Sequence, residues 1–262
     1  MQPEERYAAI MRMFDTQETV TIPQIMETFD VSIETARRDL RAMEERQMIK
    51  KIYGGAIRYN FSGSQIALYK DRSESDLPEK QAIGAKCAEY INDGDTIYIG
   101  AGTTALEAAK KLRGKKDLTI VTVSLRVALE LIDTDFSLYF LGGKLLNNEW
   151  HIITEIPDYE LKSFYCSKAI IGSLGITAKH GVTDAPIEYC KTLYKILQRC
   201  EHIYYVGANS KFGIVRPGVT CSISELDKII TDSRQKDRIL REFENSAHKL
   251  VFVDDYTIDE TH

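Results

Sequence analysis

Positively charged side chains concentrate in one short part of this sequence, residues 35–58. Seven basic and three acidic residues give that stretch a net charge of +4, whereas residues 1–34 hold two basic and seven acidic residues and carry −5. The whole chain of 262 residues also has a net charge of −5, so the positive charge is local. Lys and Arg neutralise the phosphates of a duplex, and Arg, Thr and Ser reach base edges. The pattern indicates a small DNA-reading element rather than a general binder of polyanions.

A second group of polar residues occupies turns that directly follow short apolar runs in the rest of the chain. Backbone N–H groups, hydroxyls and a lysine are groups that hold an anion at the start of a helix. In a parallel sheet such turns meet at one edge, where small ligands bind. The sequence therefore predicts a site for a polyhydroxylated anion such as a sugar phosphate, with Lys211 as counter-charge. The predicted effector-binding residues are Gly102, Thr103, Thr104, Ser124, Gly142, Gly143, Glu188 and Lys211.

Three helices and a hairpin are predicted to position the basic residues. The apolar face of the first helix is formed by Tyr7, Ile10, Met11 and Phe14. Thr21 and Gln24 form a capping box at the start of a short second helix. Ser32 is predicted to cap a third helix after a tight turn, and the glycines at 54–55 turn the chain between two short extended runs. This order of elements predicts a winged helix-turn-helix domain.

From about residue 79 the chain alternates short buried-strand patterns with amphipathic helices. Such alternation predicts a mostly parallel sheet with helices on both faces, so the fold class is α/β with an N-terminal winged helix. The predicted strands are 95–99, 118–124, 136–141, 168–171, 202–206, 228–232 and 250–253. Polar residues without a period separate the two parts. We therefore expect a DNA-binding domain at 1–58, a linker at 59–78 with a short helix around Gln65 to Lys70, and an effector-sensing and oligomerisation domain at 79–262.

The third helix and the hairpin resemble those of a known family of regulators. The run Ser32-Ile33-Glu34-Thr35-Ala36-Arg37-Arg38-Asp39-Leu40, with Tyr53-Gly54-Gly55-Ala56 after it, resembles the recognition helix and wing of the DeoR family of bacterial transcriptional regulators. The resemblance implies that DNA is contacted by Ser32, Thr35, Arg37, Arg38, Arg41, Lys50, Lys51 and Tyr53. Asp39 is expected to brace a neighbouring arginine rather than to touch phosphate.

The larger part of the chain resembles the sensor domain of the same family, whose fold is related to ribose-5-phosphate isomerase. From about Glu79 to Asp232 the matching motifs are Gly102-Thr103-Thr104, Thr122-x-Ser124, Gly142-Gly143, Gly181-Val182-Thr183 and Ser210-Lys211-Phe212-Gly213. The chain departs from the family pattern at Gly100, Val123 and Asn209, and each departure loses a polar or charged group near the expected site. The resemblance implies an effector among the phosphorylated intermediates of sugar metabolism.

Other classes of protein are not expected from the composition. Five cysteines without a C-x-x-C pair predict neither a disulfide framework nor a zinc site, and the five histidines lack ligand spacing. The N-terminus is polar and acidic, and no apolar run approaches the ~18 residues of a membrane-spanning helix. We therefore expect a soluble, cytoplasmic protein that needs no metal and no cofactor.

Two rival functions stay open at the level of sequence. A sugar-phosphate isomerase with a DNA-binding appendage would need a carboxylate base, which the turn Gly172-Ser173-Leu174-Gly175 lacks, although Asp184 lies nearby in the sequence. A protein-interaction module would show no salt-dependent binding to a duplex. The favoured hypothesis is a non-enzymatic, sequence-specific regulator of a carbohydrate-utilisation operon, a repressor rather than an activator. Its expected partners are double-stranded operator DNA, a phosphorylated sugar effector and further copies of the chain, as a dimer or tetramer.

Overall fold

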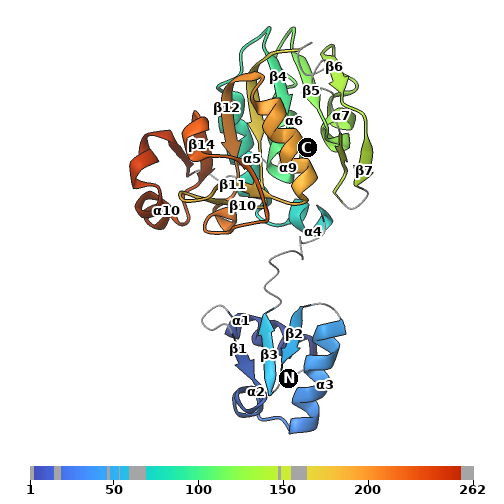
Figure 1. Cartoon of the computed structure of the whole chain (residues 1–262), viewed down its shortest axis with the longest axis vertical. Helices are drawn as coiled ribbons and strands as arrows, with labels where there is room; N and C mark the ends of the chain where they lie inside the picture. Colours follow the sequence, from blue (N-terminus) through green and yellow to red (C-terminus); the bar gives the residue numbers. More distant parts are fainter. Residues whose placement is uncertain are drawn as a thin grey trace. The chain divides into compact units, whose positions relative to one another are not determined.

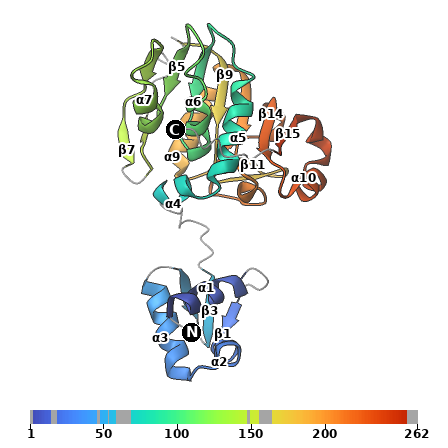
Figure 2. The same cartoon turned by 180° about the vertical axis from the view of Figure 1, so that it is seen from behind.

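The computed structural model contains two units, Met1–Gln65 and Ile66–His262 (Figures 1 and 2). Each unit has an apolar core of its own. The structure describes residues 3–14, 19–45, 48–52, 54–58, 69–146, 149–154 and 164–254. A short helix, α4 (Tyr69–Glu74), lies inside the range 59–78 that the sequence assigns to a linker, and it overlaps the helix expected around 65–70 only at its first two residues. The boundaries of that linker and of the two domains stay a prediction.

The first unit contains the predicted three helices and hairpin. Its elements are α1 (Pro3–Met13), β1 (Thr19–Thr21), α2 (Ile22–Phe29), α3 (Ile33–Glu45), β2 (Ile49–Ile52) and β3 (Gly55–Arg58). The strands pair antiparallel in the order β1-β3-β2, so the hairpin gains a third strand that the sequence analysis did not predict. The core holds Ile10, Val20, Ile25, Leu40, Met43 and Ile49, all at 0–1% exposure.

Local caps place the helices of this unit where the sequence predicts them. The backbone N–H of Thr21 donates to Gln24 Oε1 at 2.7 Å, and the backbone N–H of Gln24 donates to Thr21 Oγ1 at 3.4 Å, which completes the capping box. The hydroxyl of Ser32 accepts a hydrogen bond from the backbone N–H of Thr35 at 3.2 Å, so the predicted cap of α3 is confirmed.

A buried ion pair ties α1 to α3. Arg6 Nε donates to Asp39 Oδ2 at 2.6 Å and Arg6 Nη2 donates to Asp39 Oδ1 at 3.0 Å, a bidentate geometry. Both side chains are almost fully buried, at 6% and 1% exposure. Asp39 braces an arginine, as predicted, but that arginine is Arg6 on α1, 33 residues away in the sequence, and not a neighbour of Asp39 along the chain. This contact joins the two helices by a charge-assisted, bidentate pair inside the unit.

A seven-stranded parallel sheet forms the centre of the second unit. Its strand order is β15-β14-β12-β9-β4-β5-β6, and all six neighbouring pairs run parallel. The strands are β4 (Thr96–Ile99), β5 (Thr119–Thr122), β6 (Ser137–Phe140), β9 (Cys166–Ile171), β12 (Cys200–Val206), β14 (Lys228–Asp232) and β15 (Leu250–Val253). Each of the seven predicted strands is confirmed.

Helices cover both faces of this sheet, as the alternating pattern predicts. On one face, α5 (Leu77–Ala88), α6 (Thr103–Lys110) and α7 (Leu125–Leu131) bury Ile83, Ala108, Leu131 and their neighbours. On the other face, α9 (Ile187–Leu197) and α10 (Lys236–Glu242) bury Leu193, Ile239 and the apolar residues around them. The two sides are visible in Figures 1 and 2, where α9 lies in front of the sheet in one view and behind it in the other.

Two small antiparallel sheets, which the sequence analysis did not predict, flank the large one. The first has the order β10-β11-β13, from β10 (Gly175–Thr177), β11 (Gly181–Asp184) and β13 (Gly218–Cys221). The second is the pair β7 (Lys144–Leu146) and β8 (His151–Ile153). Short 3-10 turns occur at Asn209–Lys211, Ile223–Glu225 and Glu244–Lys249. Among the described residues no helix combines the length and hydropathy needed to cross a membrane.

Candidate functional site

Three arginines stand on the face of α3 that points away from the core. Arg37, Arg38 and Arg41 are exposed, whereas Ala36, Leu40 and Met43 on the opposite face are at 0–1% exposure. Helical spacing produces this division, because positions three and four apart share a face. None of the three arginines forms an ion pair with a residue that the structure describes. Their charge is therefore directed outward rather than neutralised by the protein.

A shallow groove runs between α3 and the hairpin that follows it. Its lining consists of Ile22, Arg37, Leu40, Arg41, Lys51, Gly54 and Gly55. Lys51 Nζ lies 3.3 Å from Glu44 Oε2, and both side chains are exposed, so this pair does little to hold the lysine in place. Gly54 has a φ of +82°, which turns the hairpin beside the groove.

The other predicted DNA-binding residues are described by the structure only in part. Ser32 is exposed and Thr35 is half-buried; their hydroxyl oxygens lie 3.2 Å apart at the start of α3. The side chain of Lys50 and the whole of Tyr53 lie outside the described residues. A role in DNA binding stays a prediction for all eight.

In the second unit a pocket opens at the carboxyl ends of three neighbouring strands. Ala101, Gly102, Thr103 and Thr104 follow β4, Gly172 follows β9, and Gly207 follows β12; all of them line it. From β4 the chain first adds β5 and β6 on one side of the sheet, and it then returns to add β9, β12, β14 and β15 on the other side. The direction in which strands are added therefore reverses between β4 and β9. Such a switch point leaves a crevice in which open α/β sheets bind ligands.

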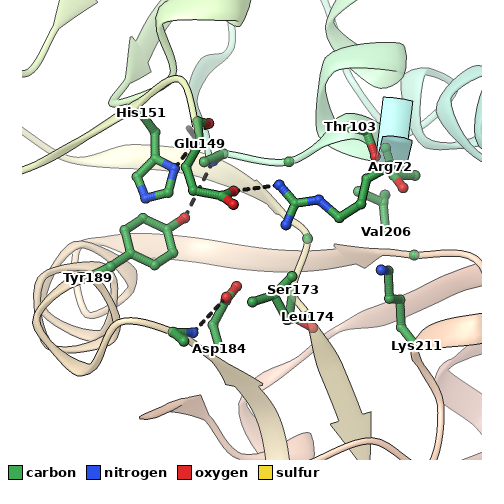
Figure 3. Close-up of a pocket in the computed structure, with 16 residues that line it drawn as sticks. Arg72, Thr103, Glu149, His151, Ser173, Leu174, Asp184, Tyr189, Val206 and Lys211 are labelled. Atoms are coloured by element: carbon green, nitrogen blue, oxygen red, sulfur yellow. Dashed lines mark hydrogen bonds and ion pairs between the residues drawn. The ribbon is translucent and has the colours of Figure 1, made fainter. Parts of the chain in front are cut away.

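Two cations face the pocket from separate elements. Lys211 comes from the turn after β12, and Arg72 comes from α4. In Figure 3 the ammonium group of Lys211 and the guanidinium group of Arg72 both point into the pocket. The pKa of Lys211 is lowered from its usual value, chiefly because the side chain is buried and secondly because Arg72 is near. Lys211 is half-buried and forms no ion pair with a residue that the structure describes, and an ammonium group in this situation is a natural partner for an anion.

Two carboxyl groups balance these cations. Glu149 forms an ion pair with Arg72, and Asp184 accepts a hydrogen bond from the backbone N–H of Ala185 at 2.8 Å (Figure 3). Burial raises the pKa of Asp184 to about 7, and the bond from Ala185 opposes that rise. Asp184 is therefore protonated in part near neutral pH, which weakens its repulsion of an incoming anion.

A histidine and a tyrosine form the wall opposite Arg72. The ring centroids of His151 and Tyr189 are 4.6 Å apart, and the backbone N–H of Ala101 donates to the Tyr189 hydroxyl at 3.4 Å (Figure 3). Burial lowers the pKa of His151 to about 4, so its ring is neutral at physiological pH. Its Nε2 atom is buried without a hydrogen-bond partner among the described residues. A polar group of a ligand would satisfy that atom.

Four of the eight predicted effector-binding residues line this pocket and four do not. Gly102, Thr103, Thr104 and Lys211 are in the lining. The hydroxyl of Ser124 is buried and accepts from the backbone N–H of Val127 at 3.3 Å, as the cap of α7. Gly142 and Gly143 are exposed before β7, and Glu188 is exposed at the start of α9. An effector-binding role stays a prediction for each of them.

The sequence analysis missed several lining residues. Arg72, Glu149 and His151 were not assigned to the site, and Asp184 was considered only for the isomerase alternative. At Asn209, one of the three departures from the family pattern, the side-chain amide donates to Asp232 Oδ1 at 2.6 Å and is buried. At another, Val123, the side chain is part of the core.

Both parts of the chain match models of the same protein family. A model described as "DeoR-like helix-turn-helix domain" matches residues 6–60, and one described as "DeoR C terminal sensor domain" matches residues 75–233. The HTH-type transcriptional repressor GlcR of Bacillus subtilis (strain 168) is 34% identical over 233 residues, 88% of this chain and 89% of that protein. The glycerol-3-phosphate regulon repressor of Escherichia coli (strain K12) is 32% identical over 237 residues, 89% and 92% of the two chains.

Similarity to solved structures is much weaker. Ribose 5-phosphate isomerase from Plasmodium falciparum aligns with a TM-score of 0.39 and 15% identity, over 51% of this chain and 52% of that one. A likeness at this level carries no argument about what the present chain does.

Proposed function

The chain belongs to the DeoR family, and on that premise we propose that it is a sequence-specific DNA-binding repressor of a carbohydrate-utilisation operon. The observation that carries the proposal is the outward-facing set of Arg37, Arg38 and Arg41 on α3, beside the groove under the hairpin. A helix of this kind enters the major groove, where arginine donates two hydrogen bonds to guanine. The relatives from Bacillus subtilis and Escherichia coli are both named as repressors, which favours repression over activation.

The proposed effector is a phosphorylated sugar metabolite held in the pocket of the second unit. Gly102, Thr103 and Thr104 stand where α6 begins, and Lys211 supplies a positive charge to the same pocket. Backbone N–H groups at a helix start together with an ammonium group suit a phosphoryl group. The relative named for glycerol 3-phosphate supports a small phosphate ester as the ligand class.

Substitution of Arg38 tests the DNA-binding half of the proposal. Arg38→Ala is expected to weaken binding to the operator by about 1–3 kcal/mol, because a bidentate contact to a base is lost. Arg12→Ala is the matched control, since Arg12 is exposed on α1 and belongs to the same unit. Fluorescence anisotropy with the intergenic DNA upstream of the gene, at one salt concentration, measures both. Equal affinity of Arg38→Ala and the wild type would remove Arg38 from the interface.

An enzymatic function is a second candidate because Asp184 lies in the pocket. A carboxyl group with a raised pKa can act as a general base in the interconversion of aldose and ketose phosphates. The regulator hypothesis expects no turnover of aldose phosphates by the purified protein. Turnover that disappears in Asp184→Asn would favour the isomerase instead.

A further inference from the structure

The ion pair between Arg72 and Glu149 crosses the proposed effector pocket. It joins two elements that are far apart in the sequence, α4 and the segment before β8. The two side chains are mostly buried, at 12% and 18% exposure. Such a pair is worth little as a source of stability, because desolvation of the charges offsets most of their attraction. Its position on the pocket wall suggests a role in ligand binding instead.

Several contacts hold α4 against the second unit. Tyr69, at its start, is 5% exposed, and the ammonium group of Lys80 donates to the backbone carbonyls of Arg72 and Ser75. After α4, Asp76 accepts a hydrogen bond from the Ser210 hydroxyl at 3.1 Å, next to Lys211. The segment 69–76 is therefore attached to the pocket at two points, the Arg72 side chain and the turn that carries Lys211.

We propose, resting on the function proposed above, that Arg72 binds the phosphoryl group of the effector and thereby exchanges its partner Glu149 for the ligand. A guanidinium group presents a planar fork that matches phosphate oxygens, and a phosphate dianion offers it more negative charge than one carboxylate. Glu149 is then a built-in competitor: it holds Arg72 beside the site and sets how much anion is needed to displace it.

The same exchange gives the pocket a connection to the DNA-binding unit. In the sequence α4 begins four residues after the first unit ends at Gln65. A change of partner at Arg72 acts on a helix of six residues, α4, and alters one of the contacts that hold this helix against the second unit. Binding can alter DNA affinity only if it favours one arrangement of this segment over another. Arg72 supplies such a difference, because it has two alternative anionic partners.

Titration with inorganic phosphate tests the exchange without DNA and without knowledge of the natural effector. Thermal unfolding of the full chain is followed as phosphate is added, with sodium chloride of equal ionic strength as the blank, because a ligand of the folded state raises its stability. Arg72→Gln is expected to weaken the apparent phosphate affinity about tenfold or more. Glu149→Gln is expected to strengthen it, since the competitor is gone. Lys211→Ala should abolish the effect if phosphate acts at this pocket.

Arg113→Gln is the matched control for the arginine substitution. Arg113 also forms ion pairs, with Glu130 at 3.4 Å and Asp133 at 2.6 Å, but it does not line the pocket. Its variant should respond to phosphate as the wild type does. A gain of affinity in Glu149→Gln cannot result from misfolding, so the test does not depend on the stability of Arg72→Gln. Equal stabilisation of the wild type, Arg72→Gln and Glu149→Gln would overturn the proposal, as would no stabilisation of any of them.

Hydrogen–deuterium exchange tests whether the binding of phosphate in the pocket affects α4. Phosphate should change the exchange of the α4 amides in the wild type and leave it unchanged in Arg72→Gln, with the amides of α10 as an internal reference. If phosphate leaves the exchange of the α4 amides unchanged in the wild type, the proposed coupling between the pocket and α4 is refuted. Failure of the chain to bind DNA would instead refute the proposed function, and it would leave the phosphate results unaffected.

Discussion

A lysine inside a protein favours an anion only if the anion replaces the water that the ammonium group has lost. Lys211 is in this situation, because burial lowers its pKa and no ion pair with a described residue compensates it. Lys211→Ala is therefore expected to retain operator affinity but to lose release by the effector. Anisotropy of a labelled operator complex during titration with phosphorylated sugars measures the response. A variant released at the wild-type effector concentration would show that Lys211 has only a structural role.

Asp184 makes the stability of the sensor depend on pH. Its folded-state pKa of about 7 lies above the ordinary value of 3.8, so folding favours its protonated form. The associated stability is present in full below about pH 4 and is lost as the pH rises through about 7, with a total on the order of a few kcal/mol. Asp184→Asn cannot ionise and should flatten this decline. Thermal unfolding between about pH 4 and about pH 8 tests the point; parallel profiles of variant and wild type would contradict it.

At the scale of elements, the contact between α1 and α3 decides whether the reading helix is held in place. Asp39→Ala removes the carboxylate that compensates the buried Arg6 guanidinium, and it is expected to cost about 3–5 kcal/mol. Exchange of the α1 and α3 amides in the full chain should accelerate accordingly. The double variant Arg6→Met, Asp39→Leu leaves no buried charge and should exchange more slowly than Asp39→Ala. If the single and double variants exchange alike, the ion pair does not anchor α3.

The elements that the sequence predicts are those with a local signal. Runs such as 96–99 and 228–232 are short, mostly buried segments centred on consecutive β-branched or aromatic residues and bounded by polar or turn residues. The caps at Thr21 and Ser32 depend on neighbours only three residues away. Strands β10, β11 and β13 have three or four residues each, which is too short for a local period to reveal them, and β11 pairs with β13 across a long sequence distance.

The pocket residues that the sequence predicts are likewise those with a local signal. Gly102-Thr103-Thr104 and Lys211 directly follow strands, where a parallel sheet collects ligand-binding turns. Arg72 lies in a polar stretch without a period, and Glu149 and His151 reach the pocket through the unpredicted pair β7 and β8. Their role depends on tertiary placement, which residue types and spacing do not encode.

At the scale of the whole molecule, we propose that one unit reads DNA and that the other binds the metabolite. A small reader domain makes few contacts alone, so we expect two or more copies on repeated half-sites, as symmetric dimers use. The phosphoryl group of the effector would act through the segment 69–76, the part of the second unit that lies nearest in sequence to the reader.

The salt dependence of binding to the upstream intergenic DNA tests the central claim most directly. Neutralisation of phosphates by basic residues of α3 and the hairpin releases counterions, so the logarithm of the binding constant should fall linearly with the logarithm of salt concentration, with a slope of about −0.9 per phosphate contacted. The wild type should also bind this DNA more tightly than a scrambled duplex of equal length at every salt concentration. A binding constant that does not respond to salt, or equal affinity for both duplexes, would contradict the account.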